Sequence, residues 1–404
     1  MNPRLPPAYN IFMIAAAALA LLLTAGAPQD GRSEPLLRLV YLARHQGENG
    51  AWGAFPASCT CPTPPAKPPP EVRVDEAVQA KVAAFIEALG AEAIDERERA
   101  QAGILEIGLP AASQLERAAR GADAERAGRA RELHARITHV RDTDGFEATG
   151  LALLAFMAAG YSHLSRDEYA DPGDGARVLR FGETVKRGLK WILAAQDGQG
   201  CFDPKDPVAN AVATLAMVEV YGMTGSMHFK DPAERGAAFV AKATSDGVRF
   251  AVWKGMVLHS ALTADVPAGS KEAITTVGDA LALKEGTLAL SGAFLLKSWA
   301  TGQKDKKLLG ELETFAPSRL AGEELQFATA AVFRSGDPAD LRWKDWTARV
   351  REQIVVPASR RIVRGCLADA KAPKTAGEHI REVANDSLSV MIIYRSGNHF
   401  AAQR

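Results

Sequence analysis

The sequence predicts an all-α fold, and three observations in it support this prediction. Runs of alternating polar and apolar residues are too short for exposed strands, so we expect few strands. Some segments are apolar almost all round and others are amphipathic, which is typical of buried helices covered by surface helices. Short sequence patterns also recur along the chain, which indicates a repeated helical unit.

The first predicted element, within residues 1–30, is an apolar segment that directs the chain to a membrane. Residues 11–27 read IFMIAAAALALLLTAGA, and the positive charges before them are Arg4 and the α-amino group. The 17 residues are near the lower limit for spanning a bilayer and slightly exceed the core of a signal peptide. We favour an uncleaved anchor over a cleaved signal peptide, because Pro28 lies close behind the small residues of a cleavage site. Both alternatives place the rest of the chain outside the cytoplasm.

Residues 34–71 are expected to form a short helix and then a loop rich in Pro and Cys. The run CPTPPAKPPP excludes a helix or an inner strand, so this loop should be an extended connector. In an oxidising compartment four cysteines can form two disulfides, with three connectivities that the sequence does not rank; loop thiols without a disulfide are the alternative. The four cysteines are Cys59, Cys61, Cys201 and Cys366.

Residues 72–140 are rich in Ala, Glu and Arg, with apolar residues at helical spacing. We expect four short amphipathic helices in two hairpins, with Gly90 at the end of the first helix. The stretch 97–137 resembles a HEAT-type helical repeat, which implies two packed helical pairs.

Residues 141–404 alternate Ala/Leu-rich helices with Gly-rich turns. Three segments are apolar almost all round and must be covered on every side, whereas two others are amphipathic and suit the cover. The apolar segments are 150–161, 211–222 and 287–302, and the amphipathic ones are 185–195 and 343–355.

Two segments share one pattern of aromatic, aliphatic, Gln, Gly and aromatic residues. They read YLARHQGENGAWG at 41–53 and WILAAQDGQGCF at 191–202. In each we expect a helix that ends in a tight turn, with the aromatic buried, the Gln bonded to backbone groups at the helix end and the Gly in the left-handed conformation. The pattern residues are Tyr41, Gln46, Gly50 and Trp52 in the first copy, and Trp191, Gln196, Gly200 and Phe202 in the second.

This pattern resembles the QW motif of the prenyltransferase and squalene oxidase repeat family. The resemblance implies an α/α toroid like that of terpenoid cyclases, in which the Gln and the terminal aromatic join neighbouring hairpins. Gln46 and Gln196 lie 150 residues apart, and 81 remain without residues 72–140, which fits two hairpins of about 40 residues. We therefore predict that the HEAT-like segment is an insertion in a loop of the toroid, which residues 34–71 and 141–404 form.

The catalytic groups that this resemblance would require are missing from the sequence. A cyclase needs an acidic cluster such as Asp-x-Asp-Asp, whereas the chain has Asp142-Thr143-Asp144. Asp142 and Asp144 are weak catalytic candidates, since Asp is also common as a helix cap. No Asp-Asp-x-x-Asp occurs, and no His stands at a suggestive spacing from Cys201 and Asp203, so we expect neither a metal nor a cofactor.

For the other candidate groups, we favour a structural role over a catalytic one. Asp203 and Asp206 could serve with Asp142 and Asp144 in a polysaccharide-cleaving site, but capping explains them as well. His45, His163 and His259 stand alone in the sequence and are expected to be structural histidines with satisfied hydrogen bonds.

The function that the sequence favours is a non-catalytic binding or scaffolding role of a membrane-anchored, exported protein. Besides the membrane, the expected partner is another protein or an apolar ligand. Lys and Arg balance Asp and Glu at 48 each, which gives no reason to expect nucleic acid. The alternative is a terpenoid cyclase or prenyltransferase-like enzyme.

Overall fold

The computed structural model divides into two compact units. Unit 1 consists of Met1–Pro64 with Asp144–Arg404, and unit 2 is Pro65–Thr143, so unit 2 lies inside unit 1 in the sequence. The described residues are 34–53, 59, 76–107, 109–139, 143–171, 174–312, 314–336, 341–352, 362–363, 366–367 and 376–401.

Most of the described residues are helical, which confirms the predicted all-α class. The strands within the described part of the chain form two short antiparallel pairs. β1 (Glu168–Ala170) pairs with β2 (Val178–Arg180), and β3 (Ile362–Val363) pairs with β4 (Cys366–Leu367).

Unit 2 contains the four short helices that the sequence predicts. α3 (Glu76–Ala88) packs on α4 (Ile94–Ile107), and after the 3₁₀ turn η1 (Leu109–Ala111), α5 (Ala112–Ala118) packs on α6 (Ala124–His139). Gly90 follows the end of α3, as expected. These helices bury a separate small core that includes Val82, Leu89, Ile104, Leu115 and Leu133. The resemblance to HEAT repeats stays a prediction.

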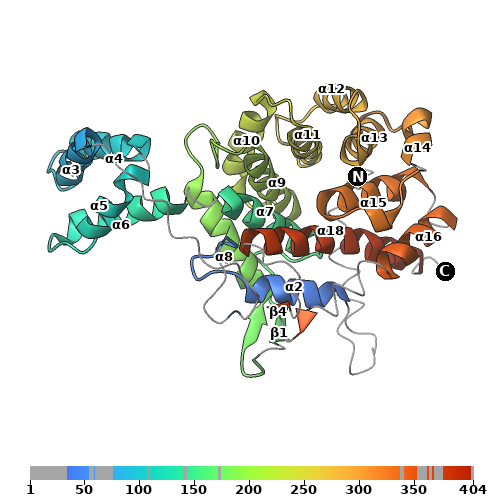
Figure 1. The fold of residues 1–404 in the computed structure, drawn as a ribbon, viewed down its shortest axis with the longest axis horizontal. Helices are drawn as coiled ribbons and strands as arrows, with labels where there is room; N and C mark the ends of the chain where they lie inside the picture. Colours follow the sequence, from blue (N-terminus) through green and yellow to red (C-terminus); the bar gives the residue numbers. More distant parts are fainter. Residues whose placement is uncertain are drawn as a thin grey trace, which may run out of the picture. The chain divides into compact units, whose positions relative to one another are not determined.

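Unit 1 alternates two sets of helices along the chain (Figure 1). We call the first set the central helices: α7 (Thr143–Ala158), α9 (Pro207–Thr224), α11 (Val248–Thr263), α13 (Thr287–Thr301), α15 (Gly322–Ser335) and α18 (Ala376–Ala401). We call the second set the covering helices: α2 (Glu34–Arg44), α8 (Phe181–Ala195), α10 (Met227–Lys242), α12 (Lys271–Ala282), α14 (Lys306–Leu312) and α16 (Leu341–Val350). A 3₁₀ turn, η2 (Pro317–Arg319), precedes α15.

The apolar composition of the central helices is explained by their burial. In α9 every residue from Val208 to Val220 is buried, because α10 and α11 both pack against it. α8 instead alternates buried and exposed positions at helical spacing, as its amphipathic sequence predicts.

Each central helix contacts the next one along the chain. A Cβ on Gly150 of α7 would lie 2.8 Å from Cγ1 of Val212, so this glycine allows α7 to approach α9 closely. α9 then packs on α11, α11 on α13, α13 on α15, and α15 on α18. Arg381 of α18 lies 3.8 Å from the carboxylate of Glu147, so the last central helix also contacts the first.

The predicted membrane anchor, residues 11–27, lies outside the described residues. Within the described ranges, no helix combines the length and the apolar character that crossing a bilayer requires.

Candidate functional site

The first glutamine motif links α2 to the next covering helix, α8. Gln46 follows the end of α2 and is 5 % exposed. Its Nε2 donates to the carbonyl of Gly50 at 2.9 Å and to the carbonyl of Thr184 in α8 at 2.8 Å. The indole of Trp52 is fully buried and donates to the Leu42 carbonyl at 2.7 Å. One amide group thus joins a turn to a neighbouring helix.

The second motif repeats this arrangement between the next two covering helices, α8 and α10. Gln196 follows α8, and its Nε2 donates to the carbonyl of Gly200 at 3.3 Å and to that of Pro232 in α10 at 2.9 Å. Arg235 donates to the Gln196 side-chain oxygen at 2.9 Å. Each glutamine side chain bonds the turn that follows it and the next covering helix. The predicted bond to backbone groups at the end of its own helix does not occur among the hydrogen bonds of the described residues.

Gly50 and Gly200 occupy equivalent positions in the two turns. Their φ angles are 96° and 95°, as expected for the left-handed region. A Cβ would lie 2.5 Å from the Arg187 carbonyl oxygen at Gly50, and 2.3 Å from that of Arg235 at Gly200. Both positions therefore exclude any side chain. Arg187-Gly188 and Arg235-Gly236 are matching dipeptides in α8 and α10, and the second is a repeat signal that the sequence analysis missed.

The predicted spacing of two hairpins between Gln46 and Gln196 is wrong. Outside unit 2, the described helices between these residues are α7 and α8, so the two corners belong to consecutive covering helices. The additional length comes from the segment 47–71 and from the segment 159–180, which carries the β1–β2 pair between α7 and α8.

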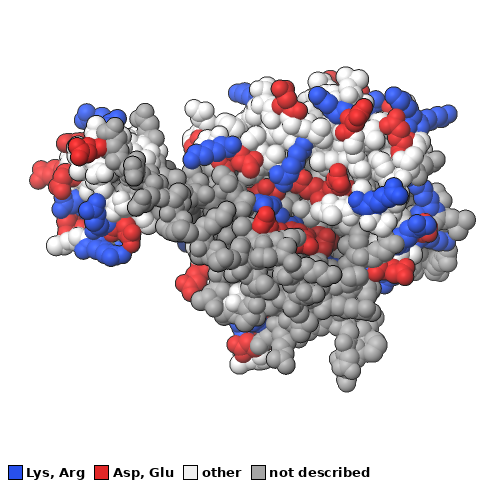
Figure 2. Space-filling view, in the orientation of Figure 1, with Lys and Arg blue, Asp and Glu red and all other residues white. Residues whose placement is uncertain are grey.

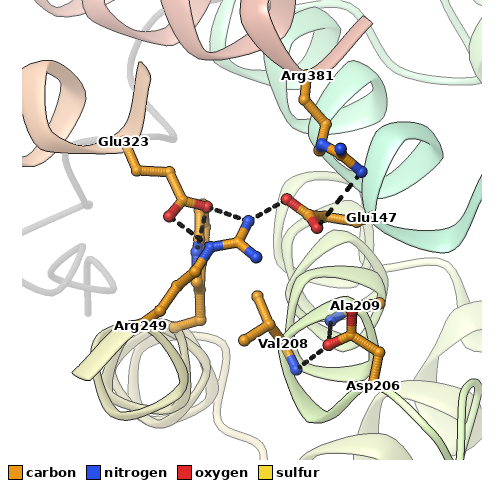
Figure 3. Close-up of polar contacts among 8 residues, drawn as sticks. Glu147, Asp206, Val208, Ala209, Arg249, Glu323 and Arg381 are labelled. Atoms are coloured by element: carbon orange, nitrogen blue, oxygen red, sulfur yellow. Dashed lines mark hydrogen bonds and ion pairs between the residues drawn. The ribbon is translucent and has the colours of Figure 1, made fainter. Parts of the chain in front are cut away.

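A cluster of charged side chains joins the N-terminal parts of four central helices (Figure 3). The Arg249 guanidinium in α11 donates to Glu147 of α7 and, at 2.7 Å from both Nε and Nη2, to Glu323 of α15. The Trp253 indole donates to Glu323 at 2.9 Å, and Arg381 of α18 lies 3.8 Å from Glu147. We call Glu147, Arg249, Glu323 and Arg381 the charged cluster. It connects four central helices.

Burial and mutual attraction compete within the charged cluster. The Glu147 side chain is 4 % exposed, and its desolvation raises the pKa of the carboxyl although Arg249 and Arg381 act against this. Burial also disfavours the charge of Arg249, but the hydrogen bond and charge of Glu323, together with those of Glu147, outweigh it and raise the Arg249 pKa. Two cations and two anions satisfy one another here, which indicates a contact that holds helices together.

A cavity of about 40 Å³ lies between five of the central helices. Its lining is apolar except for one amide and one indole nitrogen, and none of the described lining residues is acidic or basic. The lining residues are Ala158 of α7, Met256 of α11, Leu295 and Trp299 of α13, Gln326, Phe327, Ala330 and Phe333 of α15, and Leu388, Met391 and Ile392 of α18.

Two polar atoms in the wall of this cavity have no hydrogen-bond partner among the residues that the structure describes. Gln326 is 4 % exposed, and its Oε1 is buried without a partner in the described structure. The Trp299 Nε1 is likewise buried without one, while the Trp299 ring stacks on His259 at 4.2 Å. Burial, assisted by the charge of Arg334, lowers the His259 pKa to about 4, so this imidazole is neutral at physiological pH.

The charged cluster and the cavity lie along the same face of the central helices. Arg249, Trp253 and Met256 follow one another at helical spacing in α11, so they share one side of that helix. The Trp253 ring contacts the Phe327 ring edge-on at 5.2 Å between centroids. The two aromatic rings thus separate the charged cluster from the cavity.

Of the predicted carboxylate candidates, the structure describes the side chains of Asp203 and Asp206, and neither lines this cavity. Asp142 and the side chain of Asp144 lie outside the described residues. Asp206 is the N-cap of α9 and accepts from the backbone N–H groups of Val208 at 2.8 Å and Ala209 at 3.0 Å, which confirms its capping role (Figure 3). Asp203 accepts from two backbone N–H groups just before α9, and desolvation raises the pKa of its carboxyl.

The three histidines differ in the hydrogen-bond partners of their ring nitrogens. His45 is buried, with Nδ1 2.7 Å from the Tyr41 carbonyl oxygen and Nε2 3.1 Å from the Cys59 sulfur. His163 and His259 each bury an Nδ1 without a partner in the described structure, so the prediction of satisfied histidines is wrong for these two.

Cys201 is buried and forms no disulfide within the described part of the chain. Desolvation and the nearby carboxylates of Asp197 and Asp203 raise the pKa of its thiol to about 11. Cys61 and the side chain of Cys366 lie outside the described residues. Among the residues that the structure describes, no three His, Cys, Asp or Glu side chains gather as a metal site.

Comparisons with protein-family models, with curated proteins and with solved structures find no match to this chain. The resemblance to the QW repeat family therefore stays a prediction.

Proposed function

We propose that this chain is an exported, membrane-anchored α/α toroid that binds an apolar ligand, without catalysis, in the cavity between its central helices. The membrane part of the proposal rests on residues 11–27 of the sequence. The observation that carries the binding function is the apolar cavity.

The helix contacts support the toroid. Six central helices contact one another in chain order, and the pair Arg381–Glu147 connects the last of them to the first. The glutamine corners add equivalent links between consecutive covering helices, from Gln46 to α8 and from Gln196 to α10. A closed ring of hairpins accounts for both sets of contacts.

The composition of the cavity supports an apolar ligand. Ligand sites are typically concave and apolar with few polar groups, and this lining has that character. On the face shown in Figure 2, acidic and basic side chains of the described residues are interspersed, which offers no broad basic surface for a polyanion there.

The rival function, a terpenoid cyclase or prenyltransferase-like enzyme, has one observation in its favour. Trp299, Phe327 and Phe333 line the cavity, and aromatic faces can stabilise carbocations. Such an enzyme also needs an acid or a metal at the reacting atoms. The described lining supplies neither, so we favour binding; turnover of squalene or a prenyl diphosphate that is lost in Asp144→Asn would instead support the rival.

The methyl groups of two methionines provide a direct test of binding. Met256 and Met391 line the cavity, whereas Met227 is 70 % exposed elsewhere. In protein labelled with ¹³C at the methionine methyls, we expect saturating 2-methylbutane to shift the Met256 and Met391 signals and to leave Met227 unchanged.

A pair of alanine variants controls this experiment. Ala330→Leu fills the cavity and should abolish the shifts, whereas Ala280→Leu on the exposed side of α12 should preserve them. Unchanged Met256 and Met391 signals in the wild-type protein would contradict a ligand site in this cavity.

A further inference from the structure

The cavity wall contains one hydrogen-bond acceptor and one donor that nothing described satisfies. The acceptor is Oε1 of Gln326 in α15, and the donor is Nε1 of Trp299 in α13. A buried polar atom without a partner destabilises the folded state, so native structures usually provide one. Both residues line the same cavity, which makes a molecule in that cavity the natural partner.

The volume of the cavity limits the size of that partner. At about 40 Å³ it exceeds the roughly 10–15 Å³ that one water molecule needs. A few heavy atoms fill this space. A single hydroxyl oxygen can donate to Gln326 and accept from Trp299, whereas a secondary amide needs separate donor and acceptor atoms and therefore more room.

The lining also excludes a charged group on the ligand. None of the described lining residues is ionisable, and the neighbouring His259 is neutral because burial depresses its pKa. A carboxylate or an ammonium group would lose its hydration here without gaining an opposite charge.

We propose that the cavity takes the hydroxyl end of a neutral alcohol on a short hydrocarbon chain, with the hydroxyl between Gln326 and Trp299. This inference rests on the proposed function, since it names the class of ligand for the same cavity. Gln326 is then the residue that determines specificity, because it accepts the hydroxyl proton that a plain hydrocarbon lacks.

Three probes with one carbon skeleton test the inference on the full-length protein. They are 3-methylbutan-1-ol, 2-methylbutane and 3-methylbutanoate, each titrated while the Met256 and Met391 methyl signals are followed. We expect the alcohol to bind about fivefold to tenfold more tightly than the hydrocarbon, as one net hydrogen bond allows, and the carboxylate not to bind.

The variant Gln326→Leu removes the acceptor and replaces the amide side chain by an apolar one of similar size. It should bring the alcohol affinity down to that of the hydrocarbon, while the hydrocarbon still binds. Should Gln326→Leu fail to fold, Trp299→Phe removes the donor instead and is expected to lower the alcohol preference in the same direction.

The outcomes separate this inference from the proposed function. Equal wild-type affinities for the alcohol and the hydrocarbon, binding of the hydrocarbon alone, or an alcohol preference that survives Gln326→Leu would each overturn the hydroxyl site, and the apolar ligand site would stand. If 2-methylbutane leaves the Met256 and Met391 signals unchanged, the proposed function itself fails, whatever the alcohol does.

Discussion

Glu219 is an ionisable residue in the apolar interior of α9. The residues on both sides of it are buried, and Ser260 of α11 donates a hydrogen bond to its carboxyl group. Desolvation raises its pKa to about 7, although the bond from Ser260 acts in the opposite direction. The folded protein therefore holds a proton on Glu219 at pH values where a solvated carboxyl has lost it.

This shift predicts a loss of stability as the pH rises. The unfolded chain releases the proton near pH 4.3, whereas the folded protein keeps it up to about pH 7. Between these values the free energy of unfolding should fall by about 3 kcal/mol relative to Glu219→Gln, and it should stay level above pH 7.5. Urea denaturation at several pH values measures this difference. The exposed Glu272→Gln is the control, and a wild-type curve parallel to that of Glu219→Gln would contradict the prediction.

The charged cluster gives a second prediction at the residue scale. Arg249→Met removes the cation that contacts both Glu147 and Glu323, and it leaves Glu147 buried with Arg381 at 3.8 Å. Because Arg249 is 40 % exposed, we expect a loss of about 2 kcal/mol in unfolding free energy, less than for a fully buried pair. Arg120→Met breaks an exposed ion pair with Glu116 and should cost under about 0.5 kcal/mol. Equal stability of the two variants would show that the cluster does not hold the helices together.

At the scale of elements, the turns after α2 and α8 are built alike. Each has a glutamine that bonds a turn and the next covering helix, and a glycine pressed against the backbone of that helix. Two glycines in the second turn make a matched pair for mutation. Gly200 has a φ of 95° and no room for a Cβ, whereas nothing lies within 4 Å of a Cβ on Gly198.

Gly200→Ala should therefore destabilise the protein by about 2–4 kcal/mol, since the new methyl group meets the Arg235 carbonyl in a backbone conformation that alanine disfavours. Gly198→Ala should change the stability by less than about 0.5 kcal/mol. Thermal unfolding of both variants measures the effect. A Gly200→Ala protein that melts with the wild type would mean that the second turn is not built as described.

The sequence predicted these elements better than it predicted their contacts. Apolar segments such as 211–222 marked central helices, because a helix without a polar face must be buried. The turn pattern identified Gln46 and Gln196, but it could not show which helix each would bond. Glu147, Arg249 and Glu323 were missed because charged residues are common in the first turns of helices, where they also suit solvent. The residues that line the cavity were not predicted either, because they come from five separate segments.

At the scale of the whole molecule, unit 2 lies between two parts of unit 1 in the sequence. It has its own core, which includes Val82, Leu89 and Ile104, so unit 1 should not need it for folding. Replacing residues 72–140 by a short Gly-Ser linker should leave a helical protein with a cooperative thermal transition. Circular dichroism measures both properties, and an unfolded product would count against the insertion.

An apolar ligand can bind only if the central helices enclose a site that an apolar molecule can enter. Crystals held under xenon pressure test this most directly, because xenon enters apolar cavities and scatters strongly. We predict a xenon atom among Met256, Leu295, Phe327 and Met391. Well-diffracting crystals with xenon bound elsewhere in unit 1, and none between these side chains, would contradict it.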